Sequence, residues 1–119
     1  MIEIQNTKQY DLEERTLKFA KRVNIYVNNL PKTITNIENG RQLARSGGSV
    51  GANYIEANEA LSKKDFVLRI KICRKEAKES RFWLELSEPE EEYKIEKDEL
   101  ISESTQLMKI FGSILEKSK

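Results

Sequence analysis

Apolar residues recur at intervals of three and four along four separate stretches of this 119-residue chain, and this rhythm constrains the fold more than any other feature. Such intervals place side chains on one face of an α-helix. The third stretch follows a 4-3-4-3-4 rhythm through Phe66, Ile70, Cys73, Ala77, Ser80 and Leu84. We see no strand-like alternation of any length and no internal repeat. The sequence therefore predicts an all-α protein.

Local signals divide the chain into helices over about residues 11–30, 33–61, 63–87 and 93–117. Asp11 and the two glutamates that follow it suit the first turn of the first helix, because carboxylates favour the positive end of the helix dipole. Pro31 ends that helix, since the residue before a proline is pushed out of the helical region. Ser62 and Asp65 resemble a capping box at the start of the third helix. We expect residues 1–119 to form a single domain, an antiparallel up-down-up-down four-helix bundle.

The second predicted helix contains three glycines in the run from Ser46 to Ala52. Each glycine costs about 1 kcal/mol relative to alanine in a helix, so this run could break it. We predict a continuous helix because the small residues form strips that let another helix approach closely: Gly47 and Gly51, and Ala44, Gly48 and Ala52. Two helices joined by a Gly-Gly hinge are the alternative. Its inner face is expected to hold Ile34, Ile37, Leu43 or Ala44, Gly47, Gly51, Tyr54, Ile55 and Leu61.

The composition excludes several classes of site. There is no histidine, which excludes Ser-His-Asp and Cys-His catalysis and a Glu-x-x-His di-iron site. The single cysteine, Cys73, falls in the apolar rhythm and is expected in the core. The longest apolar runs are three residues, whereas a bilayer span needs about 20. We expect a cytoplasmic protein with no catalytic residue, no cofactor, no metal and no membrane partner.

Charge is unevenly distributed along the chain. Residues 1–84 carry 16 basic and 10 acidic side chains, a net charge of +6, and residues 85–119 carry 5 and 10, a net charge of −5. The most basic segment runs from Lys63 to Arg81, and its charges are expected to spread around the helix, as on an ordinary solvated surface. Clustered positive charge is what phosphate binding needs. The candidate nucleic-acid contacts are Lys18, Lys21, Arg22, Arg41, Arg45, Arg74, Lys75, Lys78 and Arg81.

A polar seam follows the second helix beside its glycines. We expect an inter-helix or inter-subunit network of Arg45, Ser49, Asn53, Glu56, Glu76 and Glu79. A catalytic carboxylate pair of Glu56 with Glu79 is the alternative interpretation, although it would need a cleft that the sequence does not indicate.

More apolar residues are present than one stripe per helix requires. The surplus consists of Ile25, Val27, Val67, Leu68, Ile72, Phe82 and Ile101. A second buried surface, and hence a homo-oligomer, would account for them.

Residues 41–57, RQLARSGGSVGANYIEA, resemble the R-S-x-S-I-G-A-N-I-x-E-A core of bacterial four-helix bundle proteins often encoded in intervening sequences of 23S ribosomal RNA genes. Residues 66–86 resemble the second block of that family, and the likeness covers about residues 11–116. It implies a continuous second helix and a ring-shaped homo-oligomer, expected to be a pentamer. A related bundle is the accessory protein of diversity-generating retroelements, a basic, nucleic-acid-binding partner of a reverse transcriptase.

The leading hypothesis is a non-enzymatic oligomer that binds RNA, DNA or a nucleoprotein complex. The alternative is a protein–protein interaction scaffold without nucleic acid. An enzyme that uses Glu56 and Glu79 is the third hypothesis.

Overall fold

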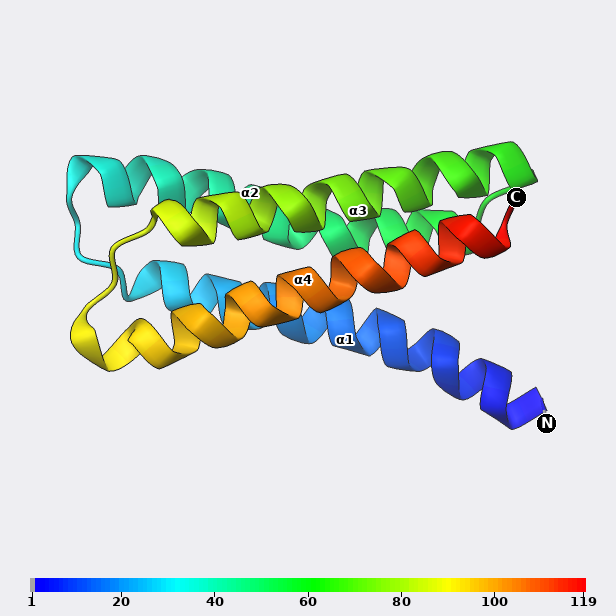
Figure 1. Ribbon diagram of the computed structural model, residues 1–119, viewed down its shortest axis with the longest axis horizontal. Helices are drawn as coiled ribbons and strands as arrows, with labels where there is room; N and C mark the ends of the chain where they lie inside the picture. Colours follow the sequence, from blue (N-terminus) through cyan, green and yellow to red (C-terminus); the bar gives the residue numbers. More distant parts are fainter. Residues whose placement is uncertain (1) are drawn as a thin grey trace.

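The computed structural model describes the backbone of residues 2–119 and the side chains of residues 12–119. It contains four long helices (Figure 1): α1 (Ile2–Asn28), α2 (Ile34–Asn58), α3 (Lys63–Leu86) and α4 (Lys94–Lys117), with the short 3-10 helix η1 (Glu91–Tyr93) before α4. Consecutive helices run antiparallel, and the described residues contain no strand. The predicted all-α four-helix bundle is confirmed.

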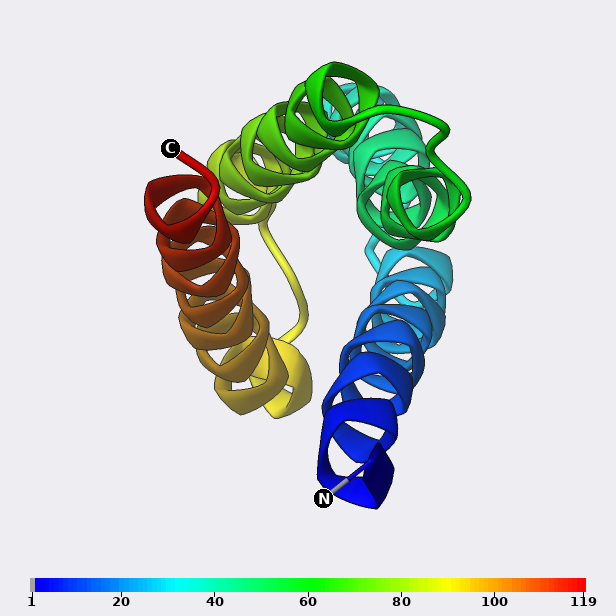
Figure 2. The ribbon, with the colours of Figure 1, turned by 90° about the vertical axis from the view of Figure 1, so that its right-hand side faces the viewer.

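The helices form an elongated bundle of 46 × 26 × 20 Å. Seen along its length, α2 and α3 stand side by side and α1 and α4 extend from them (Figure 2). The contact between α1 and α4 is the least extensive of the four neighbouring pairs. Two arginines of α1 bridge it, since Arg15 binds Glu103 at 2.7 Å and Arg22 binds Glu96 at 2.8 Å.

The core follows the predicted apolar rhythm. Its largest fully buried side chains include Phe19, Tyr26, Leu43, Ile70, Leu84, Leu100, Leu107 and Phe111. Buried hydroxyls have partners: Ser46 Oγ lies 2.9 Å from Ser80 Oγ, and the Tyr26 hydroxyl lies 2.6 Å from Ser87 Oγ. Burial also raises the pKa of Tyr26, which stays neutral in the core.

The helix α2 passes without a break through its glycines, as predicted. A Cβ built on Gly47 would lie 3.1 Å from Val23 Cγ1, and one on Gly51 would lie 2.9 Å from Thr16 Oγ1. These two glycines therefore allow the close approach of α1 to α2. Gly48 belongs to the other strip, and a Cβ built on it would meet nothing within 4 Å, so no helix approaches closely at that position.

Two details of the prediction are wrong. First, α1 begins at Ile2, so Asp11 lies well inside it; the Asp11 side chain is outside the described residues. Second, the isoleucines expected on the inner face of α2 are exposed: Ile34 by 88%, Ile37 by 49% and Ile55 by 52%. The buried residues of α2 instead follow a strict 4-3 register through Asn36, Gly40, Leu43, Gly47, Val50, Tyr54 and Ala57. The isoleucines lie one residue, about 100° of helix, from that register.

Both turns that precede α2 and α3 place a hydroxyl at the helix start. Thr33 accepts a hydrogen bond from the backbone N–H of Asn36, and Ser62 accepts one from that of Asp65. These caps fix where α2 and α3 begin. Leu61, predicted at the end of the second helix, lies in the turn and is fully exposed. In residues 12–119, no helix is both long and apolar enough to cross a bilayer.

Candidate nucleic-acid interface

The outward side of α3 carries four exposed lysines in one stripe. Lys64, Lys71, Lys75 and Lys78 stand seven, four and three residues apart, intervals that return to the same side of a helix. The opposite side of α3 is buried in the core at Cys73 and Leu84. The stripe spans about 21 Å at 1.5 Å per residue. We call these four side chains the lysine face.

The basic residues of α3 were expected to spread around the helix, and the arginines do, since Arg69 reaches Asn53 of α2 and Arg81 reaches Thr105 of α4; the four lysines share one side. The buried residues of α3 occupy one side of the helix. The acidic residues Glu76 and Glu79 lie toward α2, where both pair with Arg45. The lysines are left together on the remaining side. None of the four forms an ion pair with a carboxylate among residues 12–119. Their ammonium groups therefore have no ion-pair partner in that part of the chain.

A shallow depression between α3 and α4 runs beside the lysine face. It is lined by Lys71, Arg74, Lys75, Lys78 and Met108. On the α4 side, a Cβ at Gly112 would lie 3.9 Å from Arg74 Nη1, which places the guanidinium beside this glycine. The depression places an arginine and three lysines around one surface that an anion can reach.

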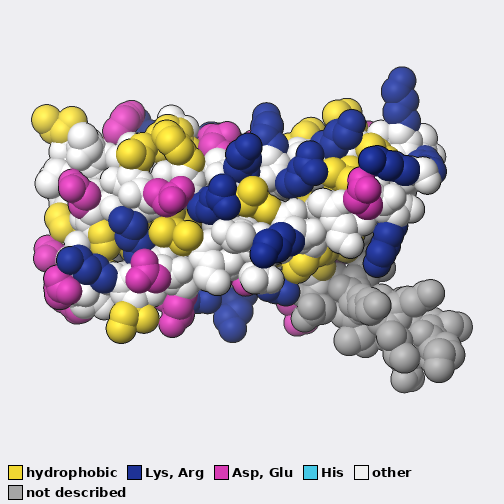
Figure 3. Space-filling model, in the orientation of Figure 1, with side chains coloured by type: hydrophobic (Ala, Val, Ile, Leu, Met, Phe, Trp, Pro, Cys, Tyr) yellow, Lys and Arg dark blue, Asp and Glu magenta, His cyan; other side chains and the backbone are white. Residues whose placement is uncertain are grey.

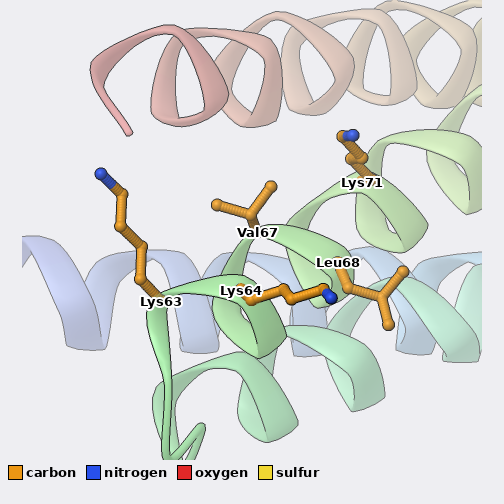
Figure 4. Close-up of a pocket in the computed structure, with 5 residues that line it drawn as sticks. All are labelled: Lys63, Lys64, Val67, Leu68 and Lys71. Atoms are coloured by element: carbon orange, nitrogen blue, oxygen red, sulfur yellow. The ribbon is translucent and has the colours of Figure 1, made fainter. Parts of the chain in front are cut away.

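A second hollow lies at the start of α3. Figure 4 shows the side chains of Val67 and Leu68 among three lysines, Lys63, Lys64 and Lys71. Lys71 lines both hollows, so the two form one continuous surface along α3. Apolar contact area and positive charge thus alternate on it.

The face formed by α3 and α4 is divided by charge. Figure 3 shows Lys and Arg side chains gathered over its middle and right-hand parts, while most Asp and Glu side chains lie toward the left-hand end. That left-hand end contains the connection from α3 to α4, where residues 88–92 hold four glutamates. A near-neutral chain therefore presents a strongly basic region.

The predicted nucleic-acid contacts do not form one patch. Arg74, Lys75 and Lys78 lie together beside α4. Lys18 and Lys21 are exposed on α1, which lies diagonally across the bundle from α3. Arg41 lines a separate hollow near the turn between α1 and α2.

Three of the predicted contacts already have partners within the bundle. Arg22 donates to Glu96 through Nε and Nη2, at 3.1 and 2.8 Å, and to Glu99. The hydrogen bonding of Arg22 to the Glu96 carboxylate, which accepts, is the main cause that raises the pKa of Arg22. Arg45 pairs with Glu76 and Glu79, and Arg81 donates to Thr105 Oγ1 at 3.4 Å. Each of these side chains would have to give up a partner to bind phosphate.

The polar seam on α2 is only partly a network. Arg45 joins Glu76 and Glu79 across the α2–α3 contact, and Glu79 also accepts from the Trp83 indole at 3.2 Å. Asn53 receives a hydrogen bond from Arg69 and donates to the backbone oxygen of Ser49. Glu56 is exposed and stands eleven residues, about 16 Å along α2, from the arginine that holds Glu79. The structure therefore does not bring Glu56 and Glu79 together as a carboxylate pair.

The sequence family is decided by a direct comparison. The family model of the 23S rRNA-intervening sequence proteins matches residues 8–113. The chain belongs to this family. A crystal structure of a protein of unknown function from the S23 ribosomal protein family of Bacteroides thetaiotaomicron is 31% identical, with a TM-score of 0.74, over 92% of this chain and 98% of that one. Comparison with curated proteins gives no match. The family membership thus carries the fold and no established activity.

Two lysines of this 23S rRNA-intervening sequence family member were not among the predicted contacts. Lys64 and Lys71 belong to the same stripe as Lys75 and Lys78. Their seven-residue spacing, which is two helical turns, is the signal that would have found them. Cys73 lies on the opposite side of α3, where burial raises the pKa of its thiol to about 12, so it cannot serve as a nucleophile near neutral pH.

Proposed function

We propose that the protein is a non-enzymatic, homo-oligomeric nucleic-acid-binding protein that holds phosphate groups on the lysine face of α3. The observation that carries the proposal is the set of four exposed lysines with no carboxylate partner in residues 12–119. A phosphate that meets them need not break an ion pair of the bundle. Neutralising phosphates also releases their condensed counterions, which supplies most of the affinity of such contacts.

Arg74 extends the site toward α4. Its guanidinium lies beside Gly112, within the depression that it lines with Lys71, Lys75 and Lys78. A planar guanidinium can bind one phosphate through two hydrogen bonds, whereas each lysine supplies a single mobile charge. We assign Arg74 the orienting contact and the lysines the electrostatic attraction.

The oligomeric part of the proposal rests on apolar exposure. Apart from Leu68 and Phe82, eight large hydrophobic side chains are at least 46% exposed, and the most exposed are Leu61, Ile34 and Ile95, at 100%, 88% and 73%. Such side chains are more numerous than a monomer of this size needs, and contact between subunits would cover them. We propose a ring, a pentamer by its resemblance to the family. A ring would present one lysine face per subunit and raise the avidity for a long nucleic acid.

The test measures binding of purified protein to fluorescent ribosomal RNA fragments and to duplex DNA over a series of salt concentrations. We expect binding at low salt that weakens steeply as salt rises. The double variant Lys75→Glu with Lys78→Glu should lose it. The matched control, Lys18→Glu with Lys21→Glu, makes the same charge change on α1 and should retain most of it. Absent binding at low salt, or loss in the α1 variant alone, would refute the proposed site.

A protein-interaction scaffold is the second candidate, and the same exposed apolar side chains favour it. It predicts that one defined protein co-purifies with the chain after nuclease treatment. In that case the ratio of absorbance at 260 and 280 nm of the purified protein stays at the value for protein alone. Nucleic-acid carry-over that nuclease removes together with every partner would exclude the scaffold.

A further inference from the structure

We infer that the lysine face receives a single strand of nucleic acid rather than a duplex, and that an unstacked base lies on the ring of Phe82. This inference rests on the proposed function and specifies its ligand. It starts from apolar side chains that stand within a charged stripe, where a purely electrostatic site would have none.

Phe82 continues the lysine face by the same rhythm, four residues after Lys78. Its side chain is 53% exposed, and Leu68, between Lys64 and Lys71, is 55% exposed. Moving along the outward side of α3, a ligand therefore meets lysine, leucine, three lysines and then phenylalanine. Exposed apolar groups cost free energy in water, so their regular place among the lysines calls for an apolar partner.

A duplex does not offer the face of a base to an aromatic ring, because its bases are stacked inside and present only their edges in the grooves. A single strand presents both phosphates and the faces of its bases. Its phosphates can follow the lysines while its bases turn toward the apolar side chains. Proteins that bind single strands combine a basic track with aromatic rings on which bases stack.

The ring of Phe82 is held in place from one side. Its centroid lies 5.0 Å from that of Trp83, with an angle of 73° between the ring planes. Trp83 is half-buried and is anchored by its hydrogen bond to Glu79. Glu79 in turn is paired with Arg45. This chain of contacts gives Phe82 a fixed edge-on neighbour while it leaves part of the ring exposed.

The acidic segment that follows Phe82 limits how far a bound strand can extend along α3. Glu85 is exposed one turn later, and residues 88–92 hold four more glutamates. Their charge repels the next phosphate. The strand is therefore expected to lie along α3 and to end at Phe82.

The intrinsic tryptophan fluorescence of the chain can report binding at this site. Trp83 is its only tryptophan and contacts Phe82 directly. A base that stacks on Phe82 should change the tryptophan emission, whereas a phosphate bound near Lys64, about 27 Å away along α3, should not.

The experiment compares a single-stranded RNA of about ten nucleotides, within the range of known single-strand sites, with the duplex of the same sequence. We expect the single strand to bind more tightly and to change the emission of Trp83. The variant Phe82→Leu should weaken single-strand binding about ten-fold and leave its salt dependence unchanged, since stacking is lost and no charge is. The aromatic variant Phe82→Tyr should bind as the wild type does.

The outcomes separate this inference from the proposed function. Equal binding of strand and duplex, with Phe82→Leu neutral, would overturn the inference and leave the lysine face as a phosphate site. A change of oligomeric state in Phe82→Leu, measured by light scattering, would also overturn it and place Phe82 between subunits. Absence of binding to either RNA at low salt would overturn both.

Discussion

The side chain of Asn36 and the backbone of Glu88 exchange two hydrogen bonds across 52 residues of sequence. Asn36 Nδ2 donates to the oxygen of Glu88 at 3.0 Å, and its Oδ1 accepts from the N–H of Glu88 at 3.0 Å. The same Nδ2 donates to the oxygen of Pro31. One buried amide thus ties together the α1–α2 turn and the connection from α3 to α4.

Replacing this amide should destabilise the whole bundle. In Asn36→Ala the backbone N–H and oxygen of Glu88 lose the partner that Asn36 supplies, whereas the oxygen of Pro31 still accepts from the N–H of Thr33. A hydrogen-bonding group left unsatisfied on burial costs about 1–3 kcal/mol. We expect the free energy of unfolding to fall by about that amount in urea denaturation. Asn39→Ala, on the same helix at a half-buried position, is the control and should lie within about 0.5 kcal/mol of the wild type. Equal stability of the two variants would show that the bridge contributes nothing.

The close approach of α1 to α2 gives a second prediction. In Gly51→Leu the new side chain would overlap Thr16, since even a Cβ would lie 2.9 Å from its Oγ1. We expect a loss of about 1–3 kcal/mol, the usual cost of overpacking. Gly48→Ala provides the opposite case, because a Cβ there meets nothing within 4 Å and alanine favours the helix by about 1 kcal/mol. Thermal melting of the two variants should shift in opposite directions, and an unchanged melting temperature for Gly51→Leu would contradict this packing.

Gly47 and Gly51 show how much of the helix packing the sequence could predict. The strip of Gly47 and Gly51 predicted a close helix contact, because small residues at four-residue spacing leave room on one side. Which helix fills that room is a tertiary question, and the sequence did not name α1. The exposed Ile34 and Ile37 were misplaced for a related reason, since apolar character indicates burial only when the residue is in register with the core.

Sequence analysis did not identify the lysine face, because the charges of α3 were considered together and not by the side of the helix on which they lie. The mixture of basic and acidic residues along α3 was interpreted as the surface of an ordinary solvated helix. In the structure Glu76 and Glu79 pair with Arg45 of α2 instead. The Asn36 bridge was invisible for a different reason, because nothing in the local sequence indicates a partner 52 residues away.

The buried thiol of Cys73 predicts both slow labelling and a pH dependence. Burial raises its pKa from 9.0 to about 12, so the folded protein keeps the proton that the unfolded chain releases. The corresponding stability is fully present below pH 9 and is lost as the pH rises from about 9 toward about 12. A thiol reagent at pH 8 should therefore react at the rate of unfolding in buffer and at once in denaturant. Rapid labelling of the folded protein would contradict the core position of Cys73.

A comparison of Arg45 with Lys75 tests whether a charge binds nucleic acid or holds the bundle together. Arg45 pairs with Glu76, whose side chain is only 9% exposed, so Arg45→Ala leaves a carboxylate without its cation. We expect Arg45→Ala to cost about 1–3 kcal/mol of stability and to leave the salt dependence of RNA binding unchanged. Lys75→Ala should do the reverse. It should leave urea denaturation unchanged and reduce the slope of log K against log salt by about 0.7, the value for one single-strand phosphate contact. If Arg45→Ala alone reduced that slope, the phosphate site would lie on the α2–α3 seam and not on the lysine face.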